Sequence, residues 1–229
     1  MPRKVQPYPQ IAATLHCIGS TGLLTNKTFV VGAFADSTGK INQVATGATG
    51  AFVPQGGSAS YVTDAIRTAG GQVVSTYFGP PRRAVRAQYA INGIFNSLDF
   101  GQQVGADLRI SGIGPIAATG FAQLSLSIQL DEADTRLNRQ VSLIQRPVRF
   151  TELGVGVGRD FNHTLVTGSA VLSSQERLQL EALNGPIALG VADVLMKEFP
   201  SLRERCGDMV ADLLRLDLPA PPVERVAAH

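Results

Sequence analysis

The sequence predicts an α/β domain from which two long β-hairpins extend, and three observations support this fold class. Apolar strand-like stretches and helical patterns alternate between residues 28 and 91, and helical patterns return after residue 173. Two Gly-rich blocks, 92–130 and 140–172, instead alternate residue by residue, and every even position of 106–130 is apolar or Gly. Such alternation places one set of side chains on each face of an extended strand. The blocks exceed the usual strand length of a small domain, so a membrane is one explanation for them.

The composition indicates a folded chain and excludes two classes of protein. Of the 229 residues, 44% are hydrophobic and 17% are charged, which argues against disorder of the whole chain. The net charge of +2 is too small to indicate a nucleic-acid partner. No apolar stretch approaches the ~18 residues that a membrane-spanning helix needs, whereas β-strands cross with ~9–11 residues. The first ten residues lack the apolar core of a signal peptide, so we expect either a cytosolic protein or a mature form without its leader.

The first α/β unit is expected between residues 28 and 91. A buried strand is predicted at 28–35, because the stretch is apolar and β-branched and ends in a turn at 36–39. A loop rich in Gly, Thr and Ala follows at 39–57. A helix is predicted at 58–69 from apolar residues on one side, and a Gly pair ends it. Strands are predicted at 73–78 and 87–95.

The two alternating blocks admit two interpretations, membrane-spanning hairpins or strands of a soluble sandwich. An acidic turn at 131–135 separates the blocks, and a hairpin tip is predicted within the second block at 153–160. Turn signals are sparser than in soluble sandwiches. The stretch 108–130 contains Pro115 but no Lys to protect a strand edge. In the second block Arg146, Arg149 and Arg159 interrupt both faces, so the pattern alone leaves the two interpretations open.

The C-terminal part predicts two helices and a tail. Asn184 is suited to the N-cap of a helix with Pro186 in its first turn, running to about residue 199. Pro200 and Ser201 restart the chain into a last helix at 202–216. The remaining residues, 217–229, are expected to be disordered.

No residue pattern supports an enzyme, a cofactor or a metal site. The glycines of 154–158 lack the spacing and the following helix of a nucleotide loop. His16, His163 and His229 share no metal-ligand spacing, and no nucleophile elbow occurs. Two cysteines, Cys17 and Cys206, are either a disulfide in an oxidising compartment or two buried thiols. The sequence therefore predicts a protein without catalytic activity.

Several strings, in the same order along the chain, resemble the curli production assembly/transport (CsgG) family of outer-membrane secretion channels, including its holdfast-anchoring relatives. They are FVVGAF at 29–34 followed by DSTG at 36–39, VPQG at 53–56, NG at 92–93, LSLSI at 124–128 and NGPI at 184–187. The resemblance spans about residues 28–199. No single string is specific, and their collinear order carries the resemblance.

The resemblance implies a periplasmic α/β domain with two transmembrane β-hairpins that contribute to an oligomeric β-barrel in the bacterial outer membrane. A ring of about nine copies would close the barrel and leave no strand edge in lipid. The implied ranges are a wrapping segment at 1–27, the periplasmic domain at 28–91, hairpins at 92–130 and 140–172, and C-terminal helices at 173–216. The implied function is a secretion channel that exports or anchors adhesin, amyloid-like or holdfast subunits together with accessory assembly factors. Family members are lipoproteins anchored through an N-terminal cysteine, a position that Cys17 lies too deep in the chain to match.

The resemblance also makes the loop at 39–57 a pore constriction. The ring of Tyr, Phe and Asn in the curli channels falls on Val44, Ala48 and Thr49, whose small uncharged side chains imply a wider pore. An ordinary flexible surface loop is the competing interpretation. For the whole chain, the alternative is a soluble periplasmic interaction domain of the lipoprotein type, without a barrel.

Overall fold

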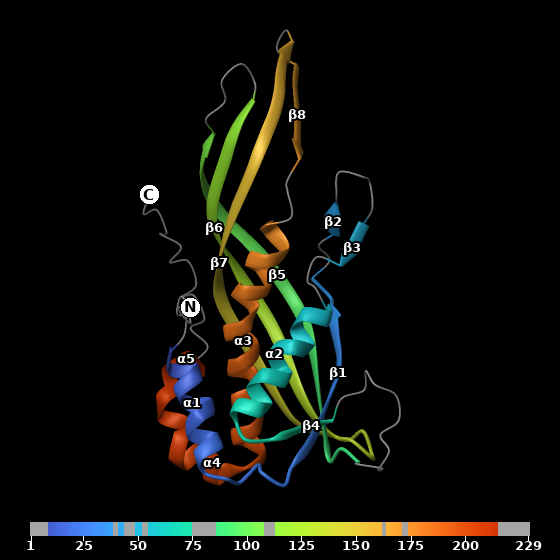
Figure 1. The fold of residues 1–229 in the computed structure, drawn as a ribbon, viewed down its shortest axis with the longest axis vertical. Helices are drawn as coiled ribbons and strands as arrows, with labels where there is room; N and C mark the ends of the chain where they lie inside the picture. Colours follow the sequence, from blue (N-terminus) through green and yellow to red (C-terminus); the bar gives the residue numbers. More distant parts are fainter. Residues whose placement is uncertain are drawn as a thin grey trace, which may run out of the picture.

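A six-stranded mixed sheet is the centre of the fold (Figure 1). The computed structural model describes residues 9–38, 41–43, 49–51, 55–74, 86–107, 113–161, 164–170 and 174–214. The strands lie in the order β4-β1-β5-β6-β7-β8. Their bounds are β1 Thr28–Asp36, β4 Gln72–Val74, β5 Tyr89–Asp107, β6 Ile113–Glu132, β7 Asn138–Phe161 and β8 Thr164–Ala170. A separate antiparallel pair, β2 Ile41–Gln43 and β3 Thr49–Ala51, lies within the predicted pore loop.

The helices form two groups (Figure 1). The long helices α2 and α3 pack over one face of the sheet, whereas α1 packs against α4 and the short turns that follow it. The bounds are α1 Pro9–Ser20, α2 Gln55–Thr68, α3 Ser174–Glu198, α4 Pro200–Cys206, the 3₁₀ helix η1 Gly207–Val210 and α5 Ala211–Leu214. Within the described ranges, every helix is too short or too polar to cross a bilayer.

The parallel part of the sheet is a β-α-β unit. Strand β1 is parallel to β4 and to β5, and α2 provides the crossover between β1 and β4. The predicted strand at 28–35 and the predicted helix at 58–69 are thereby confirmed as β1 and α2. From β5 onward each strand is antiparallel to the next, so the sheet combines both pairing modes.

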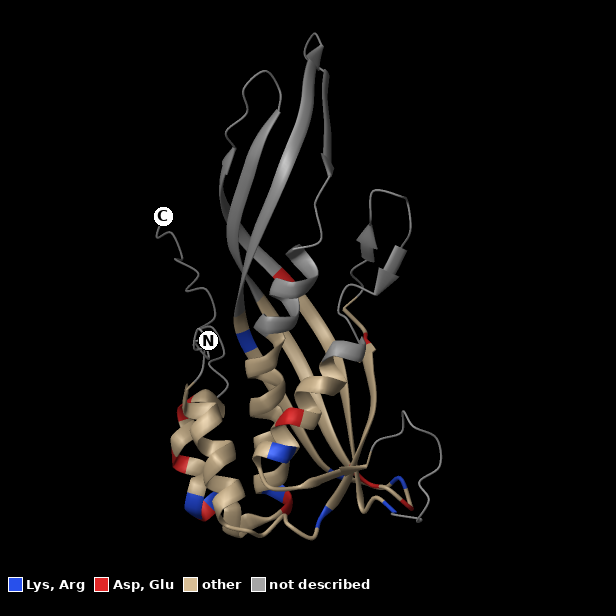
Figure 2. Cartoon of the chain, in the orientation of Figure 1, with Lys and Arg blue, Asp and Glu red and all other residues tan. Residues whose placement is uncertain are grey.

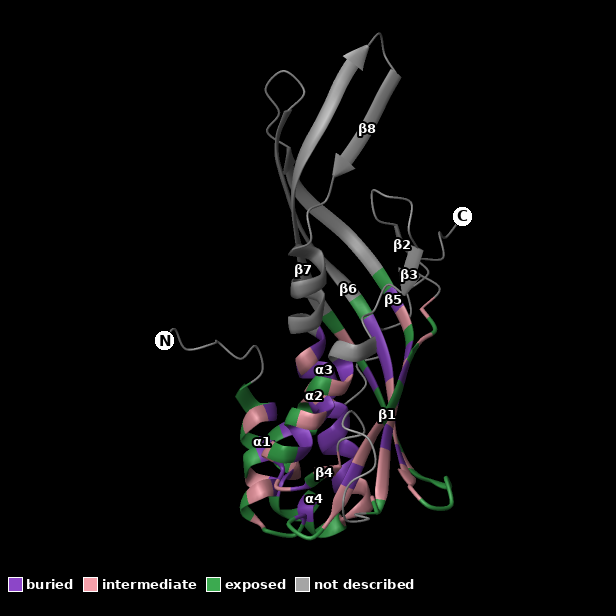
Figure 3. Ribbon diagram, turned by 45° about the vertical axis from the view of Figure 1, so that its right-hand side comes forward, coloured by how far each residue is buried: buried purple, intermediate pink, exposed green. Residues whose placement is uncertain are grey.

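Alternation along β5, β6 and β7 separates a buried face from an accessible one (Figure 3). On β6 the even positions from Leu124 to Leu130 are fully buried, while Ser127 and Gln129 between them are partly accessible. The buried side chains pack against α3, whose residues 185–196 are buried on all sides. The buried face comprises Ile91, Phe95, Leu98, Leu124, Leu126, Ile128, Leu130, Ser142 and Ile144.

Helix α3 begins ten residues earlier than the capping signal at Asn184 predicts. Pro186 lies inside the helix rather than in its first turn. A proline there removes one backbone hydrogen bond, and the burial of this part of the helix against the sheet offsets that cost. Helix α3 approaches β6 closely at Gly190 because glycine has no side chain. A Cβ at this position would lie only 2.5 Å from Ile128 Cγ1. Packing in the folded protein therefore overrides the local signal.

The predicted fold class is wrong in its account of the two blocks as transmembrane hairpins contributing to an oligomeric barrel. Both blocks are strands of one open mixed sheet, and β5 starts as the parallel neighbour of β1 within the α/β domain. The apolar positions of 124–130 face α3, and this burial explains their alternation. An alternating pattern states which side chains share a face but not what covers that face. The predicted hairpin tip at 153–160 is also wrong, because β7 continues to Phe161, which pairs with Thr164.

Candidate interaction surface

Of the three residues predicted to form the pore constriction, the structure describes one. Val44 and Ala48 lie outside the described residues, and Thr49 is the first residue of β3, paired with Gln43. His163 and His229 also lie outside them, and His16 is exposed on α1. Among the described residues, no three His, Cys, Asp or Glu side chains come close enough to hold a metal ion.

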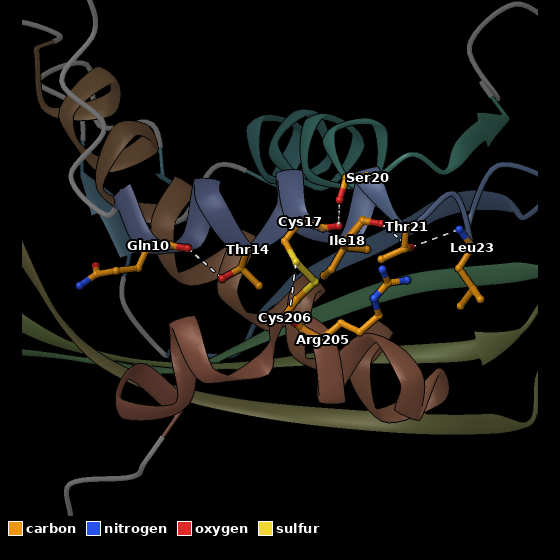
Figure 4. The surroundings of a disulfide bond; sticks show 9 residues. All are labelled: Gln10, Thr14, Cys17, Ile18, Ser20, Thr21, Leu23, Arg205 and Cys206. Carbon is orange, nitrogen blue, oxygen red and sulfur yellow. Dashed lines mark hydrogen bonds between the residues drawn. A yellow bond between two sulfur atoms is a disulfide. The ribbon is translucent and has the colours of Figure 1, made fainter.

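A disulfide between Cys17 and Cys206 ties α1 to the end of α4 (Figure 4). The two residues are 189 positions apart in sequence, and their Cα atoms are 5.9 Å apart. Cys206 is buried, and the Ser20 hydroxyl donates a 2.7 Å hydrogen bond to the Cys17 carbonyl. Disulfides of this structural kind persist in oxidising compartments such as the periplasm.

The face of the sheet opposite α2 and α3 carries a network of polar side chains. Asn92 and Asn138 both donate to the Asp131 carboxylate, at 2.7 and 2.8 Å. On the next positions along the same face, Asn96 donates to the Ser127 hydroxyl at 2.7 Å. Side-chain amides that pair across neighbouring strands stabilise the sheet while leaving this face accessible.

Strand β7 carries the large apolar side chains that are exposed near this face. Leu137, just before the strand, is 63% exposed, and Val141 and Leu143 are 45% and 43% exposed. Two ion pairs lie beside the strand: Arg139 of β7 binds Glu198 of α3 at 3.0 Å, and Lys197 binds Asp193 one turn earlier within α3. Exposed apolar side chains beside a polar rim are typical of protein interaction sites.

Two of the cavities among the described residues lie between helices. One, of about 90 Å³, lies between α1, α2 and α3 with Ile11 and Leu15 in its lining and His16 and Asp64 among its polar residues. The other, of about 360 Å³, lies between α3 and the C-terminal turns and includes Asp193. Thr68 also lines the smaller cavity.

Tyr89, at the start of β5, connects the core to the Arg139–Glu198 pair. Its ring stacks on Phe29 with centroids 5.4 Å apart and meets the edge of Phe199 at 5.9 Å. Burial raises the pKa of the Tyr89 hydroxyl, and the negative charge of Glu198 raises it further. The hydrogen bond to Glu198, and then its charge, raise the pKa of Arg139, so this guanidinium stays charged.

A raised pKa at Tyr89 makes stability fall at alkaline pH. The folded state favours the neutral phenol of Tyr89. Its contribution to the free energy of unfolding is therefore fully present below the unfolded pKa of about 10, and it is lost as the pH rises through the higher pKa of the folded state. We expect the free energy of unfolding of the wild type to fall more steeply above pH ~10 than that of Tyr89→Phe. Urea denaturation from pH 8 upward measures both slopes, and equal slopes would contradict the assignment.

Comparison with known proteins gives structural similarities at low identity. No family model and no curated protein matches the chain. Lipoprotein GNA1162 from Neisseria meningitidis is 9% identical, with 55% of this chain and 83% of that one covered and a TM-score of 0.32. A PelC dodecamer from Paraburkholderia phytofirmans is 11% identical over 71% and 86% of the two chains, with a TM-score of 0.31. A DUF330 protein from Xanthomonas campestris is 10% identical over 80% and 91%, with a TM-score of 0.32.

These findings correct the family and the location predicted from the sequence. Membership of the curli production assembly/transport family is wrong: no family model matches the chain, and the two blocks are strands of one open mixed sheet. The predicted secretion channel integral to the outer membrane is wrong as well, because its supposed spanning strands belong to one open sheet, and their described apolar positions, such as Leu126 and Ile144, are buried in the core with α3. Two of the similar structures, the one from Neisseria meningitidis and another from Caulobacter crescentus, are described as a lipoprotein and a putative lipoprotein.

Proposed function

We propose that this chain is a periplasmic interaction domain of the lipoprotein type, which binds other proteins through its uncovered sheet face and carries out no catalysis. The observation that carries the proposal is the exposure of Val141 and Leu143 beside the polar network of Asn92, Asn96 and Asp131. Rigid sheets with a mixed polar and apolar surface suit protein recognition better than chemistry, which needs convergent acid, base or nucleophile groups.

The disulfide supports the proposed compartment. Cys17 and Cys206 join the two ends of the domain, and a cytosolic thiol pair would be kept reduced. Thiol trapping in intact cells of the native bacterium therefore bears on the location. A trapped, fully oxidised pair is expected, and a fully reduced pair would contradict a periplasmic domain.

Self-association is part of the proposal only in its general form. The PelC structure named above is a dodecamer, and a chain with an accessible sheet face is able to bind further copies of itself. The ring of about nine, the contact with outer-membrane lipids and the secreted adhesin subunits stay predictions.

Site-specific photocrosslinking in the native bacterium tests the proposed function. A photoreactive residue is placed at Asn96 or Leu143 on the uncovered side and, as a matched control, at the exposed Glu204 of α4. Because only the uncovered side is proposed to bind, we expect discrete crosslinked products at Asn96 or Leu143 and none at Glu204. Mass spectrometry identifies the partner, and labelling at Glu204 alone, or at none of the three, would reject the proposal.

A further inference from the structure

The first half of β7 is an edge of the sheet among the described residues. On its inner side, β7 pairs with β6 from Asn138 to Val157. On its outer side, β8 pairs only with Val155–Phe161, and no other described strand pairs with residues 138–154. An unpaired edge presents a row of backbone donors and acceptors to any extended chain.

Backbone groups of alternate residues point outward along this edge. In an antiparallel pair the N–H and C=O of one residue point to the same side, and successive residues alternate. The Val141 carbonyl accepts a 2.9 Å hydrogen bond from Lys197 Nζ, so it is directed away from β6 toward the edge. Leu143 and Gln145 follow by alternation. Their side chains lie on the accessible face, where they would meet those of an added strand.

Three cations lie along the edge, and the exposed acid Asp212 lies beside one of them, Arg146 (Lys and Arg are blue and Asp and Glu red in Figure 2). The side chains of Arg139 and Lys197 are 51% and 33% exposed, whereas their partners Glu198 and Asp193 are only 6% and 10% exposed. Arg146 adds a third cation, which donates to the Asp212 carbonyl at 3.3 Å. Two copies of this edge paired with each other would bring like charges onto one seam, which disfavours a second copy as the occupant.

We propose that residues 138–147 of β7 bind an extended segment of a partner protein as an added β-strand, with apolar side chains at alternate positions and acidic residues at its ends. Val141 and Leu143 supply the apolar cross-strand contacts, and Arg139, Arg146 and Lys197 bind the acidic ends. Lys197 Nζ donates its hydrogen bond to the Val141 carbonyl in the free protein. When the strand is added, Lys197 must give up this carbonyl and bind a carboxylate of the peptide instead. This inference rests on the proposed function, since it names the partner class for one part of the same surface.

A labelled peptide tests the proposal with the whole chain. The probe is fluorescein-Glu-Thr-Val-Thr-Val-Thr-Val-Thr-Glu, and fluorescence anisotropy measures its Kd. One control peptide has proline in place of the central valine, which removes a ladder donor, and another has lysine in place of both glutamates. We expect each control to bind at least about tenfold more weakly than the probe. Equal binding of either control would overturn the proposal.

Protein variants locate the binding to the edge. Leu143→Pro removes an outward N–H while leaving the pairing of β7 with β6, so it should weaken the probe at least about tenfold. If Leu143→Pro fails to fold, Arg146→Glu decides, because reversing one of the three charges should reduce the preference for the probe over the lysine peptide. Unchanged preference in Arg146→Glu, or self-association in place of peptide binding, would overturn the proposal. Crosslinking at Asn96 without peptide binding would leave the proposed function standing and remove only this inference.

Discussion

Removal of the Cys17–Cys206 disulfide should lower the free energy of unfolding by about 3–5 kcal/mol. The bond closes a loop with a sequence separation of 189, and the chain entropy that it removes from the unfolded state grows with loop length. We expect the lost stability to come from weaker packing of α1 against α4, since this bond links the two helices covalently. Urea denaturation of Cys17→Ala/Cys206→Ala beside the oxidised wild type measures the difference in midpoint.

A thiol reductant added during the urea denaturation provides an internal control for this prediction. Adding it to the wild type should move the midpoint toward that of the double variant, and adding it to the double variant should change nothing. Ser20→Ala, which removes only the hydrogen bond to the Cys17 carbonyl, should change stability by about 1 kcal/mol or less. If the double variant loses less than about 1 kcal/mol, packing alone holds α1 in place and the proposed structural role of the bond is wrong.

The α/β part of the fold was predictable because its signals are local. The strand at 28–36 is apolar and β-branched and ends in a turn, and the helix at 55–68 has one apolar side. Which side chains of 124–130 share a face was predictable as well, because alternation fixes it. What covers that face was not. Capping chemistry at Asn184 led to a short helix, and the longer α3 that covers β6 and β7 was missed.

The candidate surface depends on contacts between residues that are distant in sequence. Lys197 and Val141 are joined by a hydrogen bond across 56 positions, and Arg139 and Glu198 by an ion pair across 59. The sequence carried one usable signal, the cationic residues that interrupt the second block, of which Arg146 lies at this edge. Without α3 in place, those charges interrupted both faces of the block, so they identified neither a lipid-facing side nor another role. The pairing of Cys17 with Cys206 was left open for the same reason of distance.

Leu126→Ala should destabilise the domain by about 2–5 kcal/mol in aqueous buffer without detergent. Leu126 is fully buried on the face of β6 that packs against α3, opposite Ile144 of β7. Truncation therefore removes buried apolar surface and leaves a cavity between the sheet and the helix. The urea midpoint should fall at an unchanged denaturant slope, since the folded and unfolded states expose the same surface apart from this side chain.

The neighbouring Ser127 is the matched control, because it belongs to the same strand but to the accessible face. Ser127→Ala loses one hydrogen bond from Asn96 and should cost about 1 kcal/mol or less. Comparing the losses in the free energy of unfolding of the two variants shows whether the even positions of β6 are packed in the core. A large loss at Leu126 and a small one at Ser127 follow from a face packed against α3. Equal, small losses at both would mean that the even face is not the core, and the helix-covered sheet would have to be abandoned.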